Sequence, residues 1–174
     1  AFAAYLQQRT GLQPGDRIAV QLPNLLQYPI AVFGAIRAGL IVVNTNPLYT
    51  AREMEHQFND SGAKALVCRA NMAQLAEKVV PQTSVKYVFI TEVADLLSPF
   101  KRVLINSVIK YVKKMVPAYH LPNAIKFNDV LSQGHGQPVR DANPPSSDVA
   151  VLQYTGGTTG VAKGAMLTHR NLIA

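Results

Sequence analysis

The sequence predicts an α/β fold in which helices cover a doubly wound, mainly parallel sheet. Short apolar runs typical of buried strands alternate with longer segments in which apolar residues recur every three or four positions. Such alternation is typical of strand–helix–strand units, whose crossover connections make neighbouring strands parallel. The composition, 48% hydrophobic and 16% charged over 174 residues, fits a globular domain with a sizeable core.

Before residue 91 the pattern predicts four strands, at residues 18–22, 40–43, 65–68 and 85–90. A helical pattern at residues 2–6 precedes the first strand. A second helix is expected over residues 29–38, because Pro29 suits a first helical turn and Gly39 is a common residue after a helix end. A further helix is expected over residues 72–79.

The helix between the second and third strands has the clearest boundaries. Thr50 and Glu53 have the spacing of a capping box, in which each side chain satisfies a backbone N–H at the helix start. Met54 and Phe58 lie one turn apart and define one apolar face, and Gly62 is expected to end the helix.

Residues 98–147 break this rhythm and divide the chain into three predicted parts. Six prolines fall in this region, namely Pro99, Pro117, Pro122, Pro138, Pro144 and Pro145. We therefore predict an α/β unit over residues 1–97 and a basic helix with a Pro-rich insertion or linker over residues 98–147. A strand, a loop and the start of a helix are expected over residues 148–174.

Most of the net charge of +7 comes from one segment. Between residues 98 and 120 there is no acid, and the basic residues are Lys101, Arg102, Lys110, Lys113 and Lys114. Apolar residues at helical spacing from Lys101 to Val116 predict an amphipathic helix. This helix could lie peripherally on an anionic membrane, or it could pack on its own domain with its lysines in water. Charge confined to one segment argues against a nucleic-acid-binding surface.

Cys68 is the sole cysteine, so the chain cannot form an internal disulfide. Its place in a strand-like run indicates a buried thiol in a protein from a reducing compartment. The longest apolar region, residues 29–43, is interrupted by Arg37 and is too short to span a bilayer.

The most distinctive segment runs from Tyr154 to Gly164 and reads YTGGTTGVAKG. Glycines let backbone N–H groups approach phosphate oxygens, threonine hydroxyls add donors, and a lysine adds a positive charge. An apolar run precedes the segment and a helix-start signal at Thr168 follows it, which indicates a strand, a phosphate-binding loop and a helix. The loop is not a Walker A motif, because Lys163 lies three residues after Gly160.

This pattern resembles the signature of the adenylate-forming superfamily, which includes acyl-CoA synthetases, luciferases and peptide-synthetase adenylation domains. Gly156 replaces the usual Ser and removes one hydroxyl, and Ala162 replaces the usual Pro, which makes the turn less rigid. Residues 37–44, 46–50 and 60–64 extend the resemblance toward bacterial long-chain fatty-acid–CoA ligases of the FadD type.

The resemblance implies part of the N-terminal domain of an enzyme that uses ATP to convert a long-chain fatty acid to acyl-AMP and then, with coenzyme A, to acyl-CoA. It implies ATP phosphate contacts for Tyr154, Thr155, Gly156, Gly157, Thr158, Thr159, Gly160, Val161, Ala162, Lys163, Gly164 and Ala165. Lys163 would stabilise the leaving pyrophosphate, and the Thr155 hydroxyl would lie near Mg²⁺. Each threonine could instead serve turn geometry, and Tyr154 could stack on the base or pack in the core.

Several alternatives stay open. The carboxylic acid could be medium-chain or aryl, or the chain could be a non-enzymatic nucleotide-binding or membrane-docking fragment. The resemblance implies further machinery beyond Ala174, so we expect the 174 residues alone to be inactive. It also implies a cytoplasmic protein, with peripheral contact at the inner face of the cell membrane as an option, and it is compatible with an oligomer.

Overall fold

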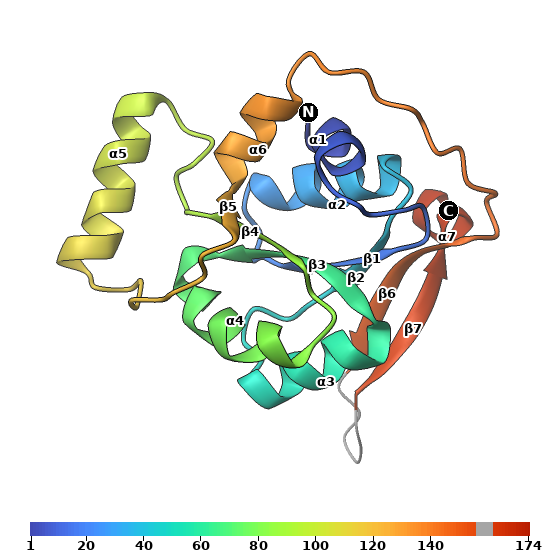
Figure 1. The fold of residues 1–174 in the computed structure, drawn as a ribbon, viewed down its shortest axis with the longest axis horizontal. Coiled ribbons are helices and arrows are strands. Elements are labelled where there is room, and N and C mark those ends of the chain that lie inside the picture. Colours follow the sequence, from blue (N-terminus) through green and yellow to red (C-terminus); the bar gives the residue numbers. More distant parts are fainter. Residues whose placement is uncertain (156–161) are drawn as a thin grey trace.

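A computed structural model describes residues 1–155 and 162–174. These residues form a seven-stranded sheet with the order β5-β4-β3-β1-β2-β6-β7 (Figure 1). The strands are β1 (Arg17–Gln21), β2 (Ile41–Asn44), β3 (Ala63–Arg69), β4 (Tyr87–Thr91), β5 (Ala124–Lys126), β6 (Val149–Thr155) and β7 (Lys163–Thr168). Neighbouring strands are parallel except β6 and β7, which form an antiparallel hairpin.

Helices cover both faces of the sheet, as the doubly wound prediction requires. They are α1 (Phe2–Arg9), α2 (Gln27–Arg37), α3 (Ala51–Ser61), α4 (Ala73–Val79), α5 (Pro99–Ser107), α6 (Phe127–Gly134) and α7 (His169–Ile173). Short turns η1 (Ala70–Met72) and η2 (Val80–Gln82) flank α4, and the π-helical turn η3 (Val108–Val112) continues α5. Helices α1, α2 and α6 lie on one face, and α3 and α4 lie on the other (Figure 1).

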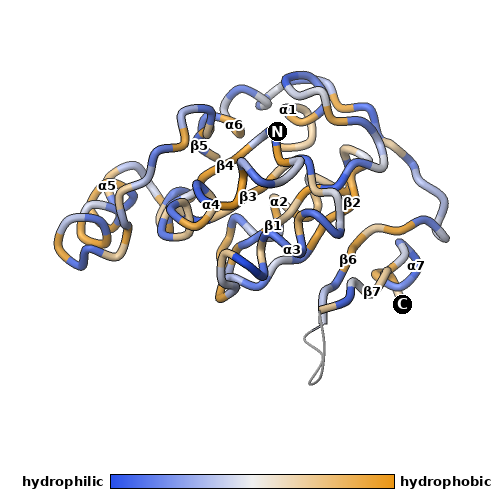
Figure 2. Tube along the Cα trace, turned by 60° about the horizontal axis from the view of Figure 1, so that its bottom comes forward, coloured by the Kyte–Doolittle hydropathy of each residue, from blue (hydrophilic) through white to orange (hydrophobic). Residues whose placement is uncertain are grey.

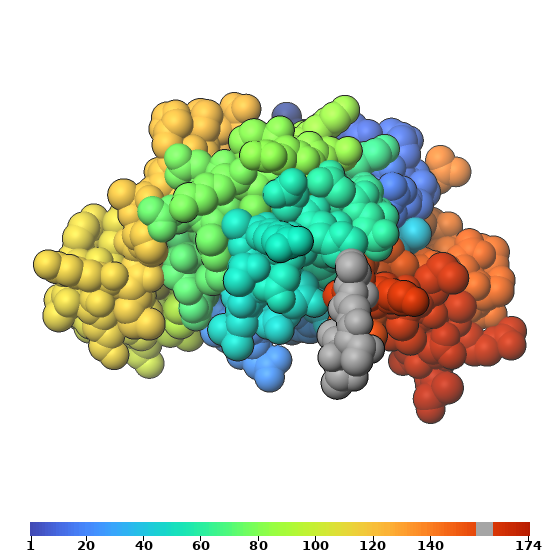
Figure 3. All heavy atoms as spheres, turned by 90° about the horizontal axis from the view of Figure 1, so that it is seen from below, coloured from blue at the N-terminus to red at the C-terminus, as the bar shows by residue number. Residues whose placement is uncertain are grey.

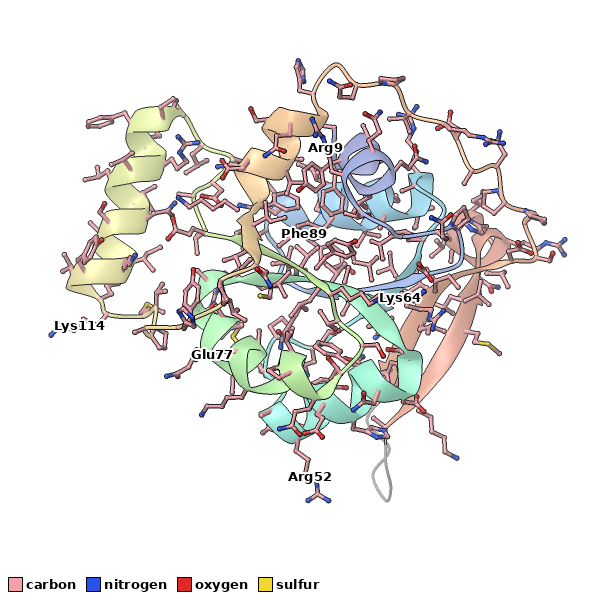
Figure 4. The ribbon with its side chains drawn as sticks, viewed as in Figure 1. Arg9, Arg52, Lys64, Glu77, Phe89 and Lys114 are labelled. Carbon is pink, nitrogen blue, oxygen red and sulfur yellow. The ribbon has the colours of Figure 1, made fainter. Side chains whose placement is uncertain are left out.

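Each face has its own core. Beneath α1 and α6, the ring centroids of Phe2 lie 5.8 Å from Phe89 and 5.2 Å from Phe127, and Phe89 points into this layer in Figure 4. Beneath α3 and α4, Met54 and Phe58 are fully buried, as their predicted apolar face requires. In Figure 2, hydrophobic stretches run along the central strands, and others lie on the helices, α5 among them.

The local signals for α3 are confirmed. Thr50 and Glu53 form the predicted capping box, and Gly62 ends the helix in the left-handed conformation with φ of 62°. Gly39, which follows α2, also has a positive φ of 89°. The four strands predicted before residue 91 are all present, with boundaries shifted by one or two residues.

Residues 98–147 contain more of the sheet than the sequence predicted. β5 pairs with β4 through Val88 and Ala124, and α6 buries Phe127 and Val130. The predicted helix from Lys101 to Val116 instead spans α5 and η3 and ends at Val112. These two elements contain no fully buried residue, but Ile105, Val108 and Ile109 are half-buried, so packing on the domain and contact with a membrane both stay predictions. The three-part division of the chain itself stays a prediction.

Candidate phosphate-binding hairpin

The hairpin of β6 and β7 carries the predicted phosphate-binding segment. The sequence predicted a strand, a loop and a helix, and the structure adds β7 between the loop and α7. Six predicted contacts lie outside the described residues, namely those of Gly156, Gly157, Thr158, Thr159, Gly160 and Val161. The described stems place Thr155 and Lys163 opposite each other, and both side chains are exposed.

The stems lie at the carboxyl edge of the parallel strands, where open α/β sheets commonly bind ligands. β6 pairs with β2 in register Val42 to Val151. A polar network continues this pairing, because Asn44 Nδ2 donates to Gln153 Oε1 at 2.7 Å. Gln57 Nε2 on α3 donates to the Asn44 carbonyl oxygen at 3.0 Å. The strand that leads into the loop is therefore fixed to both β2 and α3.

Tyr154, the first residue of the predicted segment, packs in the core, which was one of its two predicted environments. Its hydroxyl donates to Asp60 Oδ2 on α3, and its ring contacts β7. A Cβ added to Gly164 would lie 3.0 Å from a ring carbon, so glycine leaves the space that the ring occupies. Burial, and then the neighbouring Asp60 carboxylate, raises the pKa of the Tyr154 hydroxyl. The hydroxyl therefore remains a hydrogen-bond donor at neutral pH.

After the predicted loop, Ala162 is half-buried and its carbonyl oxygen lies 3.4 Å from His56 Nε2 on α3. Gly164 is half-buried and Ala165 is exposed. Thr168 caps α7 as predicted and forms a capping box with Asn171. Sequence reasoning did not connect His56 or Asp60 with the loop, because α3 lies about a hundred residues earlier and only strand order brings it to β6.

The part of the chain that the structure describes contains no group of three or more His, Cys, Asp or Glu residues able to hold a metal ion. Within the same residues, no helix has the length and apolar character needed to cross a bilayer.

A parallel sheet whose carboxyl edge carries a Gly- and Thr-rich segment with an exposed lysine is typical of α/β proteins that bind nucleotide phosphates. The chain belongs to the AMP-binding enzyme family, whose sequence profile matches residues 1–174. Long-chain-fatty-acid–CoA ligases are similar to it: that of Haemophilus influenzae is 60% identical over 173 residues, and that of Escherichia coli O157:H7 is 59% identical over 174 residues. These matches cover 99% and 100% of this chain, which spans 31% of the length of each relative.

Solved structures show the same fold. A long-chain-fatty-acid-CoA ligase from Archaeoglobus fulgidus matches 98% of this chain and 28% of its own, with a TM-score of 0.70 and 29% identity. A didomain of a carboxylic acid reductase from Segniliparus rugosus matches 99% of this chain and 24% of its own, with a TM-score of 0.77 and 17% identity. The predicted fold class and the adenylate-forming family are both confirmed.

Proposed function

We propose that this chain is part of an ATP-dependent long-chain-fatty-acid–CoA ligase. The observation that carries the proposal is the identity of 58–60%, over 173 or 174 residues, to several enzymes of that name. The exposed Thr155 and Lys163, on facing stems of the candidate phosphate site, support the same activity. The partners would be a fatty acid, ATP and coenzyme A.

In such a reaction the fatty carboxylate attacks the α-phosphorus of ATP, and the bond to the departing pyrophosphate breaks. The coenzyme A thiol then displaces AMP from the acyl-AMP, and the thiol proton is released. The main obstacle is repulsion between a carboxylate and a polyphosphate anion, so positioning and charge neutralisation matter more than acid–base chemistry. The Lys163 ammonium would stabilise the charge on pyrophosphate as it leaves.

Mg²⁺ would arrive with ATP as part of the substrate. It prefers oxygen ligands, often keeps several waters and bridges phosphate oxygens. The exposed Thr155 hydroxyl fits one such ligand, and the described residues offer no acidic cluster that would hold the ion without the nucleotide. The Thr155 hydroxyl would help to hold the metal–nucleotide complex at the end of β6.

The test is palmitate-dependent ATP–pyrophosphate exchange in a chimera. This chain replaces the matching segment of the Haemophilus influenzae ligase, with which it shares 60% identity. We expect exchange in the chimera and none with the 174-residue chain alone. Lys163→Ala should lower the exchange rate about a hundredfold, because a charge that stabilises the transition state is lost. Lys78→Ala, which removes an exposed lysine from α4, should leave the rate unchanged.

Other outcomes separate the alternatives. Exchange with medium-chain or aryl acids but not with palmitate would move the proposal to another carboxylic acid. A folded chimera that binds ATP and exchanges with no acid would favour a non-enzymatic nucleotide-binding module.

A second candidate function, peripheral membrane contact, is favoured by the surface of α5 and the segment that follows it. Large apolar side chains there are more than half exposed, namely Phe100, Val103, Leu104, Tyr111, Val112 and Met115. Lys114 points away from the domain in Figure 4. In Figure 3, α5 and the hairpin lie at opposite ends of the molecule. We call the stretch from Pro99 to Val116 the basic arm. Apolar and cationic side chains together suit the surface of an anionic membrane.

A further inference from the structure

One helix touches both stems of the candidate phosphate-binding loop. Asp60 accepts the hydroxyl hydrogen bond of Tyr154, which lies just before the loop. His56, one turn earlier on α3, contacts the carbonyl oxygen of Ala162, which lies just after it. Residues four apart share one face of a helix, so this face meets the base of the hairpin from both sides.

The Tyr154 contact fixes both strands of the hairpin at once. Tyr154 on β6 is the register partner of Gly164 on β7, and the Tyr154 ring fills the space above that glycine. Tyr154 is 7% exposed and Asp60 is exposed, so their hydrogen bond lies at the edge of the core. Hydrogen bonds to a charged acceptor are about twice as strong as neutral ones.

The exposed side chain of His56 contacts the other stem. Its Nε2 lies 3.4 Å from the Ala162 oxygen, and the tautomer with a proton on Nε2 donates to that carbonyl. Between His56 and Asp60, Gln57 also holds the Asn44 carbonyl of β2, whose side chain bonds to Gln153. Three side chains of α3 therefore contact the hairpin or the strand beside it: Asp60 contacts β6, His56 contacts the residue before β7, and Gln57 contacts β2.

Helix α3 is itself firmly held. Its N-terminus has a complete capping box at Thr50 and Glu53, and Met54 and Phe58 anchor it on the sheet. At its C-terminus, Arg17 Nε donates to the Ser61 carbonyl at 2.7 Å. Because α3 is fixed at both ends, its side chains can hold the hairpin residues that they contact in one position.

We propose that α3 positions the two described stems of the candidate phosphate-binding hairpin for ATP, with Asp60 and His56 as its positioning residues. Stems that are ordered before ATP binds lower the conformational entropy that is lost on binding. The two side chains act through Tyr154 and Ala162. This proposal rests on the proposed function, because it assigns these residues to the ATP step of the same reaction.

The experiment measures KM for ATP and for palmitate in the ATP–pyrophosphate exchange of the chimera described above. Asp60→Ala and Tyr154→Phe should each raise KM for ATP about tenfold and leave KM for palmitate unchanged. Asp60→Asn keeps an oxygen acceptor for the tyrosine hydroxyl and should restore most of the affinity. His56→Ala should raise KM for ATP in the same direction. The double variant Asp60→Ala/Tyr154→Phe should be no worse than either single one, because both remove the same bond.

The matched control is Asn59→Ala, which changes the same helix on the side that donates to the Gln82 carbonyl at 3.2 Å. It should leave KM for ATP unchanged. The proposal is overturned if Asp60→Ala and Tyr154→Phe lower the melting temperature but keep a wild-type KM for ATP, because the contact would then be structural only. If the Asp60→Ala variant does not fold, the KM of Tyr154→Phe for ATP decides the test, because that variant keeps the buried ring and removes only the hydroxyl. Lys163→Ala separates the two proposals: if it alone impairs exchange, the loop binds phosphate and the role of α3 is wrong.

Discussion

At the scale of single residues, burial sets the chemistry of the sole cysteine. Cys68 lies on β3 between β1 and β4, and its side chain is fully buried. Burial raises the pKa of its thiol from 9.0 to about 12, because the apolar surroundings disfavour a thiolate. Only the thiolate is a good nucleophile, so the folded protein protects this group.

We expect Cys68 to react with a disulfide reagent such as dithionitrobenzoate about a thousandfold more slowly at pH 8 in the folded chain than in guanidinium chloride. The difference reflects the smaller thiolate fraction that the raised pKa leaves. Absorbance at 412 nm follows the reaction. Equal rates in both states would mean that β3 is accessible in the native protein.

At the scale of elements, the sequence was informative where an element carries its own signal. The α3 helix has its capping box, its apolar face and its terminal glycine, and each matches the structure. β7 has no such signal, because an edge strand with Met166 70% exposed shows no clear hydrophobic alternation. β5 has only three residues, and its pairing with β4 is a tertiary contact.

The same limit applies to the candidate site and to the basic arm. The candidate site could be predicted because glycines, threonines and a lysine at this spacing are typical of loops that bind phosphate. Asp60 and His56 looked like ordinary helix residues, because their role depends on the order of strands in the sheet. An apolar stripe on α5 looks the same whether it faces protein, lipid or water, so only the structure could reveal its exposure.

Two single glycine substitutions, compared with each other, test whether the Arg17 contact at the end of α3 stabilises the fold. Gly62 and Gly136 have similar φ angles of +62° and +69°, which an alanine adopts only with strain. A Cβ at Gly62 would also collide with the Arg17 guanidinium, whereas nothing lies within 4 Å of a Cβ at Gly136. Gly136→Ala should cost about 1 kcal/mol from backbone strain. Gly62→Ala should cost about 1 kcal/mol more, because the Arg17 bond to Ser61 is disturbed.

Urea unfolding followed by circular dichroism gives both free energies of unfolding. Equal costs for the two alanines would show that the Arg17 contact contributes nothing and that only the left-handed backbone matters.

At the scale of the whole molecule, two functions are proposed for opposite ends. The hairpin carries the candidate phosphate site, and the basic arm carries the apolar and cationic surface (Figure 3). In the described part of the chain, α5 is tied to the domain by Asn106, whose Oδ1 accepts from the Ala94 N–H at 3.0 Å and whose Nδ2 donates to Asp95 at 3.2 Å. Membrane contact at this end would leave the hairpin directed away from the lipid.

The basic arm should bind vesicles that contain anionic phosphatidylglycerol, and it should bind neutral phosphatidylcholine vesicles weakly. Changing Lys110, Lys113 and Lys114 together to Glu should abolish co-sedimentation with anionic vesicles, because each basic residue near the surface contributes about 1 kcal/mol. The matched control reverses three exposed charges elsewhere, Arg52, Lys78 and Lys86, and gives the same net charge. If both triple variants lose binding equally, overall charge is responsible and the arm is not the contact.

The register between β2 and β6 also has a consequence for how the protein is made. β6 finds its place beside a strand that was synthesised about a hundred residues earlier, with Val42 opposite Val151. β1, β2, β3 and β4 pair over much shorter stretches of chain, and short loops close at a lower entropy cost. During synthesis on the ribosome these four strands can associate while the hairpin is still inside the exit tunnel. We therefore expect the hairpin with the candidate phosphate site to be the last part of the sheet to assemble, after the core of the nascent chain has formed.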